Sequence, residues 1–261
     1  MRIASFTQTY GDHRFLELQL LQHDRIGNAF RNQCDLILFS FHNCPEAFLK
    51  KSVDLLKTIY PSSKLKILIY NKVPYLQCIR STIQYLKQNG YDYMLQIQDD
   101  QHGINTQENL NAIENIQDLF TSLRTHQLDY LHIFSNEGNK THNKLTPLQE
   151  MTCGNTEFYC YDSRDFKRAN IYAWNDGTYF AKIEFLEHLF NRQLPEDVWR
   201  IELTLKATLE KNCVLRWGTN KLYFKASNLH GRNVNRAMSV EENLKRFFGE
   251  LPEWPTILTY L

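Results

Sequence analysis

The sequence predicts an α/β fold with a mostly parallel central sheet flanked by helices, and two observations favour this class. Strand and helix patterns alternate through about the first 135 residues, as in parallel strands joined by helical crossovers. The strand segments are short apolar runs, as expected for strands covered by helices. Polar stretches and short aromatic segments follow, so we expect residues 1–135 and 136–261 to form a larger and a smaller region of one domain.

Five strands are expected in the first half, at residues 3–7, 35–40, 65–70, 93–97 and 128–134. The first is expected to end at Thr7, before a polar loop that begins with Gln8. In open α/β sheets, ligands bind beyond the carboxyl ends of the strands. The residues that follow these strands are therefore the first place to look for a functional site.

Helices are expected between the strands. Residues 15–22 have helical composition, and residues 47–59 read as a helix with an apolar side. The clearest helix begins near Pro74, which suits a first turn, and stops at Gly90. Its apolar side is marked at helical spacing by Leu76, Ile79, Ile83 and Leu86.

Two further helices are less plainly marked. Asn105 and Glu108 resemble a capping box that opens a helix. In residues 198–209, apolar side chains alternate as in a strand but also fit helical spacing. A strand of that length would be unusual, and Glu, Lys, Ala and Leu favour helix. We therefore expect a helix that starts near Glu196 and Asp197, whose charges complement the helix dipole.

Composition argues against several functional classes. The formal net charge is +1, and Lys and Arg are spread along the chain, so no general attraction to nucleic acid is expected. The sequence has no apolar run near 18 residues and no signal-peptide core, which predicts a soluble, cytoplasmic protein. It also lacks a P-loop, a GxGxxG and a GxSxG motif. The six cysteines form no CxxC pair and are expected to be reduced, with a Cys153–Cys160 pairing left open.

The pair Asp99–Asp100 is the most informative motif. It follows the apolar segment 93–97, where a buried strand is expected to leave the sheet. Two carboxylates are costly to bury there unless they face a cleft or bind a cation. Mg²⁺ and Mn²⁺ take oxygen ligands and often bridge to a substrate phosphate. The pair therefore suggests a metal–diphosphate site, and an acidic turn that caps the next element is the alternative.

These features together resemble the glycosyltransferases of the GT-A fold. In that family a DxD-like motif holds a divalent metal on the diphosphate of a nucleotide sugar. Here the motif is Gln98-Asp99-Asp100, with Gln98 at the first acidic position. The resemblance covers roughly residues 1–230, and it implies a Rossmann-like sheet and Mn²⁺ or Mg²⁺ as the cofactor.

By the same resemblance, Asp100 is expected to bind the metal directly, with Asp99 toward the ribose or a metal-bound water. Similar enzymes often use a downstream histidine, and His230 fits this role because it lies in a polar loop after an expected strand at 222–225. Neutral imidazole is a reasonable Mn²⁺ ligand. His102, beside the acidic pair, is a competing candidate, and a surface position is the alternative for His230.

Nucleotide contacts are expected from the loops that follow the first and third strands and from nearby arginines. The residues in question are Thr7, Gln8, Tyr10, Arg14, Asn71, Arg80 and Asp99. The Tyr10 ring would stack on a base, and a guanidinium suits phosphate because of its bidentate fork. An ordinary loop and a solvated helix surface are the alternatives. Many uridine-binding relatives place an Asp near the end of the second strand, where this chain has Ser40-Phe41-His42, so the base stays open.

An inverting transfer needs a carboxylate that deprotonates the acceptor hydroxyl. Similar enzymes carry an acidic element at the start of an acceptor-side helix, which makes Asp197 the first candidate, followed by Glu202 and Glu196. Simple capping of that helix is the alternative. The cluster Trp174, Asn175 and Asp176 combines an aromatic face with polar groups, as in a sugar-acceptor site, although core packing would also explain the Trp.

The sequence thus predicts a metal-dependent glycosyltransferase that moves a sugar from a nucleotide-diphosphate sugar to a glycan or another hydroxyl acceptor, with inversion preferred. A non-catalytic nucleotide- or glycan-binding module of the same fold is one alternative. A sugar nucleotidyltransferase is another, although residues 8–12 contain one Gly and no Lys where such enzymes usually have a Gly-rich, basic loop. The oligomeric state stays open.

Overall fold

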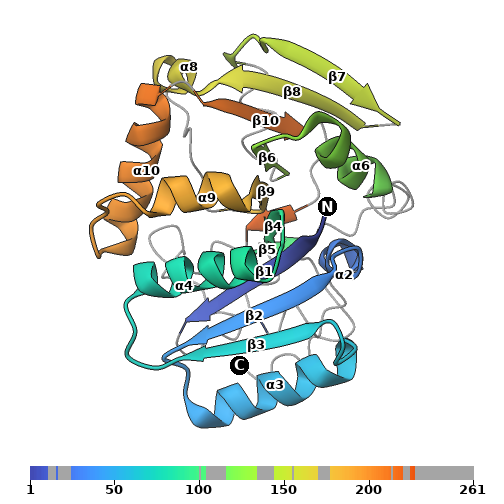
Figure 1. The fold of residues 1–261 in the computed structure, drawn as a ribbon, viewed down its shortest axis with the longest axis vertical. Helices are drawn as coiled ribbons and strands as arrows, with labels where there is room; N and C mark the ends of the chain where they lie inside the picture. The colour runs from blue at the N-terminus through green and yellow to red at the C-terminus, as the bar shows by residue number, and fades with distance from the viewer. Residues whose placement is uncertain are drawn as a thin grey trace, which may run out of the picture.

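The computed structural model shows a nine-stranded mixed sheet with helices on both faces (Figure 1). It describes residues 1–10, 16, 25–99, 101–103, 116–133, 144–154, 156–169, 177–212, 214–219 and 224–226.

The elements of the first half alternate between strand and helix, as the sequence predicts. In chain order they are β1 (Ile3–Tyr10), α2 (Arg25–Asn32), β2 (Leu36–His42), α3 (Glu46–Ile59), β3 (Leu65–Tyr70), α4 (Tyr75–Gln88), β4 (Tyr93–Gln96), β5 (Gln101–Gly103), α6 (Ile116–His126) and β6 (Tyr130–His132).

The second half adds further strands to the same sheet. In chain order its elements are β7 (Gln149–Cys153), β8 (Thr156–Asp162), α8 (Ser163–Arg168), β9 (Tyr179–Lys182), α9 (Ile183–Phe190), α10 (Val198–Asn212), β10 (Leu215–Thr219) and β11 (Phe224–Ala226).

The strand order of the large sheet is β3-β2-β1-β4-β9-β6-β10-β8-β7. Neighbouring strands from β3 to β4 are parallel, and β6 and β10 are parallel to each other. β9 is antiparallel to both of its neighbours, as β8 is. β5 and β11 form a separate two-stranded antiparallel sheet. The predicted α/β class is confirmed, with the parallel strands concentrated in the first half.

Two apolar clusters cover the two faces of the sheet, because neighbouring residues of a strand point to opposite sides. Phe6 and Met94 face α4, α9 and α10, whereas Leu95 and Phe180 face α2 and α6. A third cluster joins β2 to α3 through Phe39 and its neighbours. Figure 1 shows α4 and α9 lying together in front of the sheet, with α10 beside them.

β1 is longer than predicted. The expectation that it ends at Thr7 is wrong, because the strand continues through Gln8 to Tyr10 and pairs with β2 until Tyr10 lies opposite His42. Thr7 is buried, and its hydroxyl accepts a hydrogen bond from Arg31 at 3.2 Å. The polar side chains that resemble a loop in the sequence are therefore those of a central strand.

α2 is not predicted by the sequence. Its interior contains Gly27 and Asn28, which lower helix propensity. Its helical conformation is stabilised by packing, since Ile26 and Phe30 are completely buried against the sheet. Tertiary contacts therefore outweigh local propensity here.

Several sequence predictions of helices are confirmed. α4 begins after Pro74, and Gly90 beyond its end has a φ of +71°. Residues 198–212 form a helix and not a strand. Of the helix expected at 15–22, only Leu16 lies within the described residues, as a buried helical residue.

The five cysteines within the described residues are all free, including Cys153 and Cys160. The open Cys153–Cys160 pairing is therefore not formed, and Cys213 lies outside those residues. Among the same residues, no helix is both long and apolar enough to cross a bilayer.

Candidate active site

The carboxyl ends of β1, β2, β3 and β4 meet at one edge of the sheet, because these four strands are parallel neighbours. Phe6 of β1 lies opposite Gln96 of β4, so Gln8 and Asp99 come two and three residues beyond that pair. Asn71 directly follows the end of β3. The structure thus brings Gln8, Asn71 and Asp99 to the same edge.

Asp99 lies in a turn that is held by a buried glutamine. The backbone N–H of Gln101 donates to the carbonyl of Gln98 at 3.2 Å, and its side-chain Nε2 donates to Oε1 of Gln98 at 3.1 Å. The hydroxyl of Thr178 donates to Oε1 of Gln101. Asp99 is half-buried, and Asp100 lies outside the described residues.

β11 brings a later part of the chain beside this turn. Its residue Ala226 pairs with Gln101, the residue that follows Asp100. Beyond Ala226 the sequence continues toward His230, which lies outside the described residues. The competing candidate His102 pairs with Lys225 in the same small sheet.

A small pocket, partly open to solvent, lies between β4, β9, α4, α9 and α10. Its polar lining residues are Gln96, Tyr179 and Glu202. The Tyr179 hydroxyl donates to Oε1 of Gln96 at 2.7 Å, and both residues are buried. The rest of the wall is apolar and includes Tyr75 and Phe190. A half-buried carboxylate, that of Glu202, therefore shares a pocket with the end of the strand that leads to Asp99.

The other two candidates for a base lie at the start of α10. Oδ1 of Asp197 accepts the backbone N–H of Arg200 at 3.0 Å, which is the geometry of a helix N-cap. Glu196 and Asp197 are exposed. They do not line the pocket that contains Glu202.

Arg80 is engaged by backbone carbonyls. Its Nε donates to the carbonyl of Phe190 at 2.8 Å, and its Nη2 donates to that of Arg192 at 2.7 Å. These carbonyls lie at the end of α9, where the helix dipole favours a cation. In this structure the guanidinium therefore joins α4 to α9.

His42 ends β2 beside Gln8 and was not among the sequence candidates. Its Nε2 lies 3.1 Å from Nε2 of Gln8 and 3.3 Å from Oγ of Ser40. The ring is buried, and burial lowers the pKa of His42 to about 4. It therefore stays neutral at physiological pH. The only sequence signal for it was its place at the end of the second expected strand.

Three other residues of the site also escaped the sequence analysis. Tyr179 begins β9, Thr178 directly precedes it, and Gln96 ends β4. Their roles depend on the insertion of β9 beside β4, which local sequence does not encode. A buried Gln within an apolar strand was the one signal that could have pointed to Gln96.

Several sequence candidates lie outside the described residues, namely Arg14, Asp100, Trp174, Asn175, Asp176 and His230. The side chain of Tyr10 is likewise not described. Within the described residues, no group of three or more His, Cys, Asp or Glu is placed to hold a metal ion.

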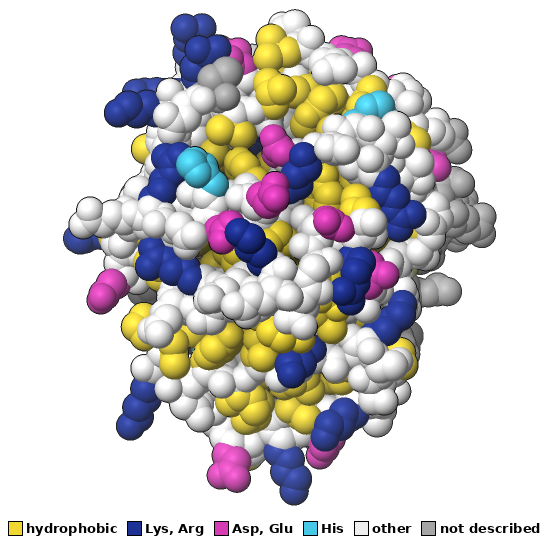
Figure 2. All heavy atoms as spheres, viewed as in Figure 1, with side chains coloured by type: hydrophobic (Ala, Val, Ile, Leu, Met, Phe, Trp, Pro, Cys, Tyr) yellow, Lys and Arg dark blue, Asp and Glu magenta, His cyan; other side chains and the backbone are white. Residues whose placement is uncertain are grey.

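On the face that carries α4, α9 and α10, acidic and basic side chains are interleaved (Figure 2). This mixture agrees with the formal net charge of +1. It offers no extended basic surface on this face for a polyanion.

Solved structures with a similar fold include glycosyltransferases. The mannosyltransferase PcManGT from Pyrobaculum calidifontis, in complex with GDP-Man and Mn²⁺, matches with a TM-score of 0.53 and 11% identity, over 99% of this chain and 68% of that chain. TarS from S. aureus matches with a TM-score of 0.51 and 12% identity, over 87% of this chain and 36% of that chain. Its portion 1–349 matches with a TM-score of 0.50 and 13% identity, over 87% and 60%.

These identities are low, so the likeness shows the fold, which is GT-A-like as the sequence predicts. The chain spans about a third of the TarS chain and 60% of its shorter form. No family model matches the sequence, and no curated protein matches it.

Proposed function

We propose that this chain is a metal-dependent glycosyltransferase that moves a sugar from a nucleotide-diphosphate sugar to a hydroxyl acceptor. One observation carries the proposal: Glu202 and Gln96 line the same pocket, and Asp99 follows Gln96 by three residues. In this proposal Glu202 is the base and Asp99 belongs to the metal site, so the two would flank the end of β4. Direct displacement needs this arrangement, with the acceptor activated on one side of the sugar and the leaving group held on the other.

The residues near the acidic turn suit Mn²⁺ or Mg²⁺. Carboxylate oxygens of Asp99 and Asp100 with one imidazole of His230 are an appropriate donor set. Ala226 pairs with Gln101, and His230 follows Ala226 by four residues, which span at most about 14 Å. The chain is therefore short enough to keep His230 within about that distance of Ala226. When bound, the metal would neutralise charge on the diphosphate. PcManGT, of similar fold, was solved with Mn²⁺, which supports this choice.

We assign the role of general base to Glu202 in preference to Asp197. Glu202 would accept the proton of the acceptor hydroxyl as that oxygen bonds to the anomeric carbon and the bond to the diphosphate breaks. Attack from the side opposite to the leaving group would invert the anomeric centre. Asp197 is exposed and caps α10, so it has a structural task at that position.

The nucleotide would lie over the carboxyl edge of β1 to β4. There Gln8 and Asn71 would contact the nucleotide, together with Tyr10 and Arg14. We leave Thr7 out, because it is buried and its hydroxyl accepts a hydrogen bond from Arg31. We leave Arg80 out, since its guanidinium binds two backbone carbonyls. Trp174, Asn175 and Asp176 stay the proposed acceptor contacts.

Release of nucleoside diphosphate from a panel of nucleotide sugars, with and without Mn²⁺, tests the activity. We expect turnover with at least one donor, dependence on Mn²⁺, and loss of the metal-stimulated rate in Asp100→Ala. Nucleotide binding without release of diphosphate from any donor would favour a binding module. Turnover only of a nucleoside triphosphate with a sugar phosphate, with release of pyrophosphate, would favour a nucleotidyltransferase.

Two matched substitutions identify the base. Glu202→Gln and Asp197→Asn each remove a carboxylate and keep the shape, and Asn caps a helix as well as Asp does. We expect Glu202→Gln to lower kcat for transfer by about a hundredfold or more and to leave its donor binding unchanged. The Asp197→Asn variant is expected to keep a kcat near that of the wild type. The reverse result would assign the base to Asp197.

A further inference from the structure

The acidic turn and the start of β9 share one buried side chain, that of Gln101. Its amide is 3% exposed, and the Thr178 side chain that it contacts is fully buried. With the Thr178 hydroxyl donating to Oε1, the NH₂ group of Gln101 is directed to Gln98. Both polar ends of the Gln101 side chain are thus engaged on opposite sides.

The backbone of Gln101 makes two more connections. Its N–H closes the turn onto the carbonyl of Gln98, and the residue pairs with Ala226 of β11. Gln101 therefore touches the residue before Asp99, the start of β9 and the strand that precedes His230 in the sequence.

Resting on the proposed function, we propose that Gln101 is a positioning residue that, with Thr178, fixes the acidic turn in its metal-binding form. The structure also gives Gln98 a task. It stands at the first acidic position of the DxD-like motif, and its side chain is an acceptor for Gln101 within the turn. In this proposal Gln98 holds the turn in place through its hydrogen bond with Gln101 and is not a metal ligand.

The physical reason is the energy of buried polar groups. Removing the Thr178 hydroxyl takes a hydrogen-bond donor away from the buried Oε1 of Gln101, which is unfavourable unless the amide rotates. Rotation would break the hydrogen bond to Gln98 and loosen the turn. Residues that orient metal ligands from behind typically change metal affinity 10- to 100-fold when they are replaced.

Mn²⁺ binding to the otherwise metal-free full chain tests the proposal without any measurement of turnover. Free Mn²⁺ is followed by its electron paramagnetic resonance signal for the wild type, Thr178→Val, Thr178→Ser and Gln101→Met. We expect Thr178→Val and Gln101→Met to weaken binding at least tenfold. Thr178→Ser keeps the hydroxyl and is expected to stay within about threefold of the wild type.

Thr156→Val is the matched control, because Thr156 is also a buried threonine, 3% exposed, but lies on β8, three strands away from β9. It is expected to keep wild-type affinity, and thermal melting without metal verifies that each variant is folded. If Thr178→Val and Gln101→Met bind Mn²⁺ as tightly as the wild type does, the role of Gln101 is refuted and the proposed function still stands. A wild-type chain that binds no Mn²⁺ would overturn both.

Discussion

Gly154 lies in the tight connection between β7 and β8 with a backbone φ of +57°. A Cβ at this position would overlap the carboxylate of Asp118 on α6. We expect Gly154→Ala to lower the free energy of unfolding by more than the roughly 1–2 kcal/mol that a left-handed conformation costs a non-glycine residue, because the Asp118 carboxylate must also move away. Urea denaturation measures the change.

Gly90→Ala is the matched control for this prediction. Gly90 also has a positive φ, of +71°, but the atom nearest to an added Cβ would be the end of the Arg2 side chain, at 3.9 Å. Only the backbone cost of about 1–2 kcal/mol is expected there. Replacing Asp118 by Ala should recover part of the loss in Gly154→Ala, and equal costs for the two glycines would refute the steric argument.

His42 links stability to pH. Burial lowers its pKa from 6.5 to about 4, so between these values the unfolded chain binds a proton that the folded chain does not. Stability is therefore expected to fall as the pH drops from about 6.5 toward 4, by at most about 1.4 kcal/mol per pH unit from this group. Urea midpoints at pH 7, 6 and 5 measure the slope.

His42→Asn should flatten that slope, whereas the same change at the exposed His126 of α6 should not. If both variants keep the wild-type slope, the acid sensitivity arises elsewhere. His42 also shows which property of a single residue could not be predicted from the sequence. Its position after a strand was visible, but its burial against Gln8 and Tyr70 depends on three strands coming together.

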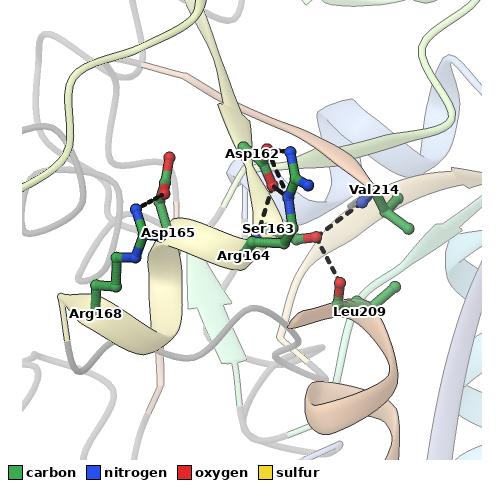
Figure 3. A network of polar contacts seen from close by, with 7 residues as sticks. All are labelled: Asp162, Ser163, Arg164, Asp165, Arg168, Leu209 and Val214. Carbon is green, nitrogen blue, oxygen red and sulfur yellow. Dashed lines mark hydrogen bonds and ion pairs between the residues drawn. The ribbon is translucent and has the colours of Figure 1, made fainter. Parts of the chain in front are cut away.

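At the scale of elements, Ser163 joins the start of α8 to the end of α10 (Figure 3). Its hydroxyl donates to the carbonyl of Leu209 at 2.6 Å and accepts the N–H of Val214 at 2.8 Å. We expect Ser163→Ala to cost about 1–3 kcal/mol, because the Leu209 carbonyl, in a buried position, and the partly buried N–H of Val214 both lose this partner. The loss is measured by urea denaturation.

Ser52→Ala is the comparison for Ser163. Ser52 of α3 is also fully buried, but its hydroxyl has no hydrogen-bond partner among the described residues. Its removal is expected to be nearly neutral, and a large loss there would mean that buried hydroxyls matter in this protein for reasons other than hydrogen bonding.

Arg80 holds the end of α9 against α4. We expect Arg80→Met to lower stability by about 1–3 kcal/mol, since two charge-assisted hydrogen bonds to backbone carbonyls are lost. Arg80→Lys should recover only part of this, because an ammonium lacks the planar fork. Arg168→Met, which removes an exposed surface ion pair at 3.4 Å, is expected to change thermal stability little.

The elements that the sequence predicts well carry their own local signals. α4 has Pro74 before its first turn and Gly90 beyond its end, and apolar periodicity between them. β1 and α2 were predicted less well, because the conformation of their residues depends on the segments that pack against them. Thr7 and Gln8 extend a strand only because β2 lies alongside, and α2 is held by burial despite Gly27.

At the scale of the whole molecule, the sequence predicts the class but not the strand order. β9 comes late in the chain, yet it lies between β4 and β6. No local pattern around Tyr179 predicts this insertion, which creates the contact with Gln96 and brings Tyr179 into the lining of the pocket. The proposed site could be predicted where it follows a strand end, as at Asp99, and not where distant segments meet, as at Gln96 and Tyr179.

The insertion of β9 between β4 and β6 also bears on whether residues 1–135 can fold without the rest of the chain. Without it, β4 would lose a neighbour along its whole length, from Tyr93 to Gln96. The apolar face of β1 and β4 would lose its cover from α9 and α10, which supply Leu186, Leu189, Ile201 and Leu205. Leaving such side chains unburied costs about 1.5–3 kcal/mol each, so the four together cost about as much as the stability of a whole domain. The two halves should therefore depend on each other.

We expect a fragment of residues 1–135 to show no cooperative thermal transition and to bind a dye for exposed apolar surface, whereas the full chain melts cooperatively. Circular dichroism and dye fluorescence on both proteins measure the difference. Adding residues 136–226 as a separate chain should restore a transition, because the partner of β4 is then supplied. A fragment that melts cooperatively by itself, near the temperature of the full chain, would mean that residues 1–135 form an independent domain.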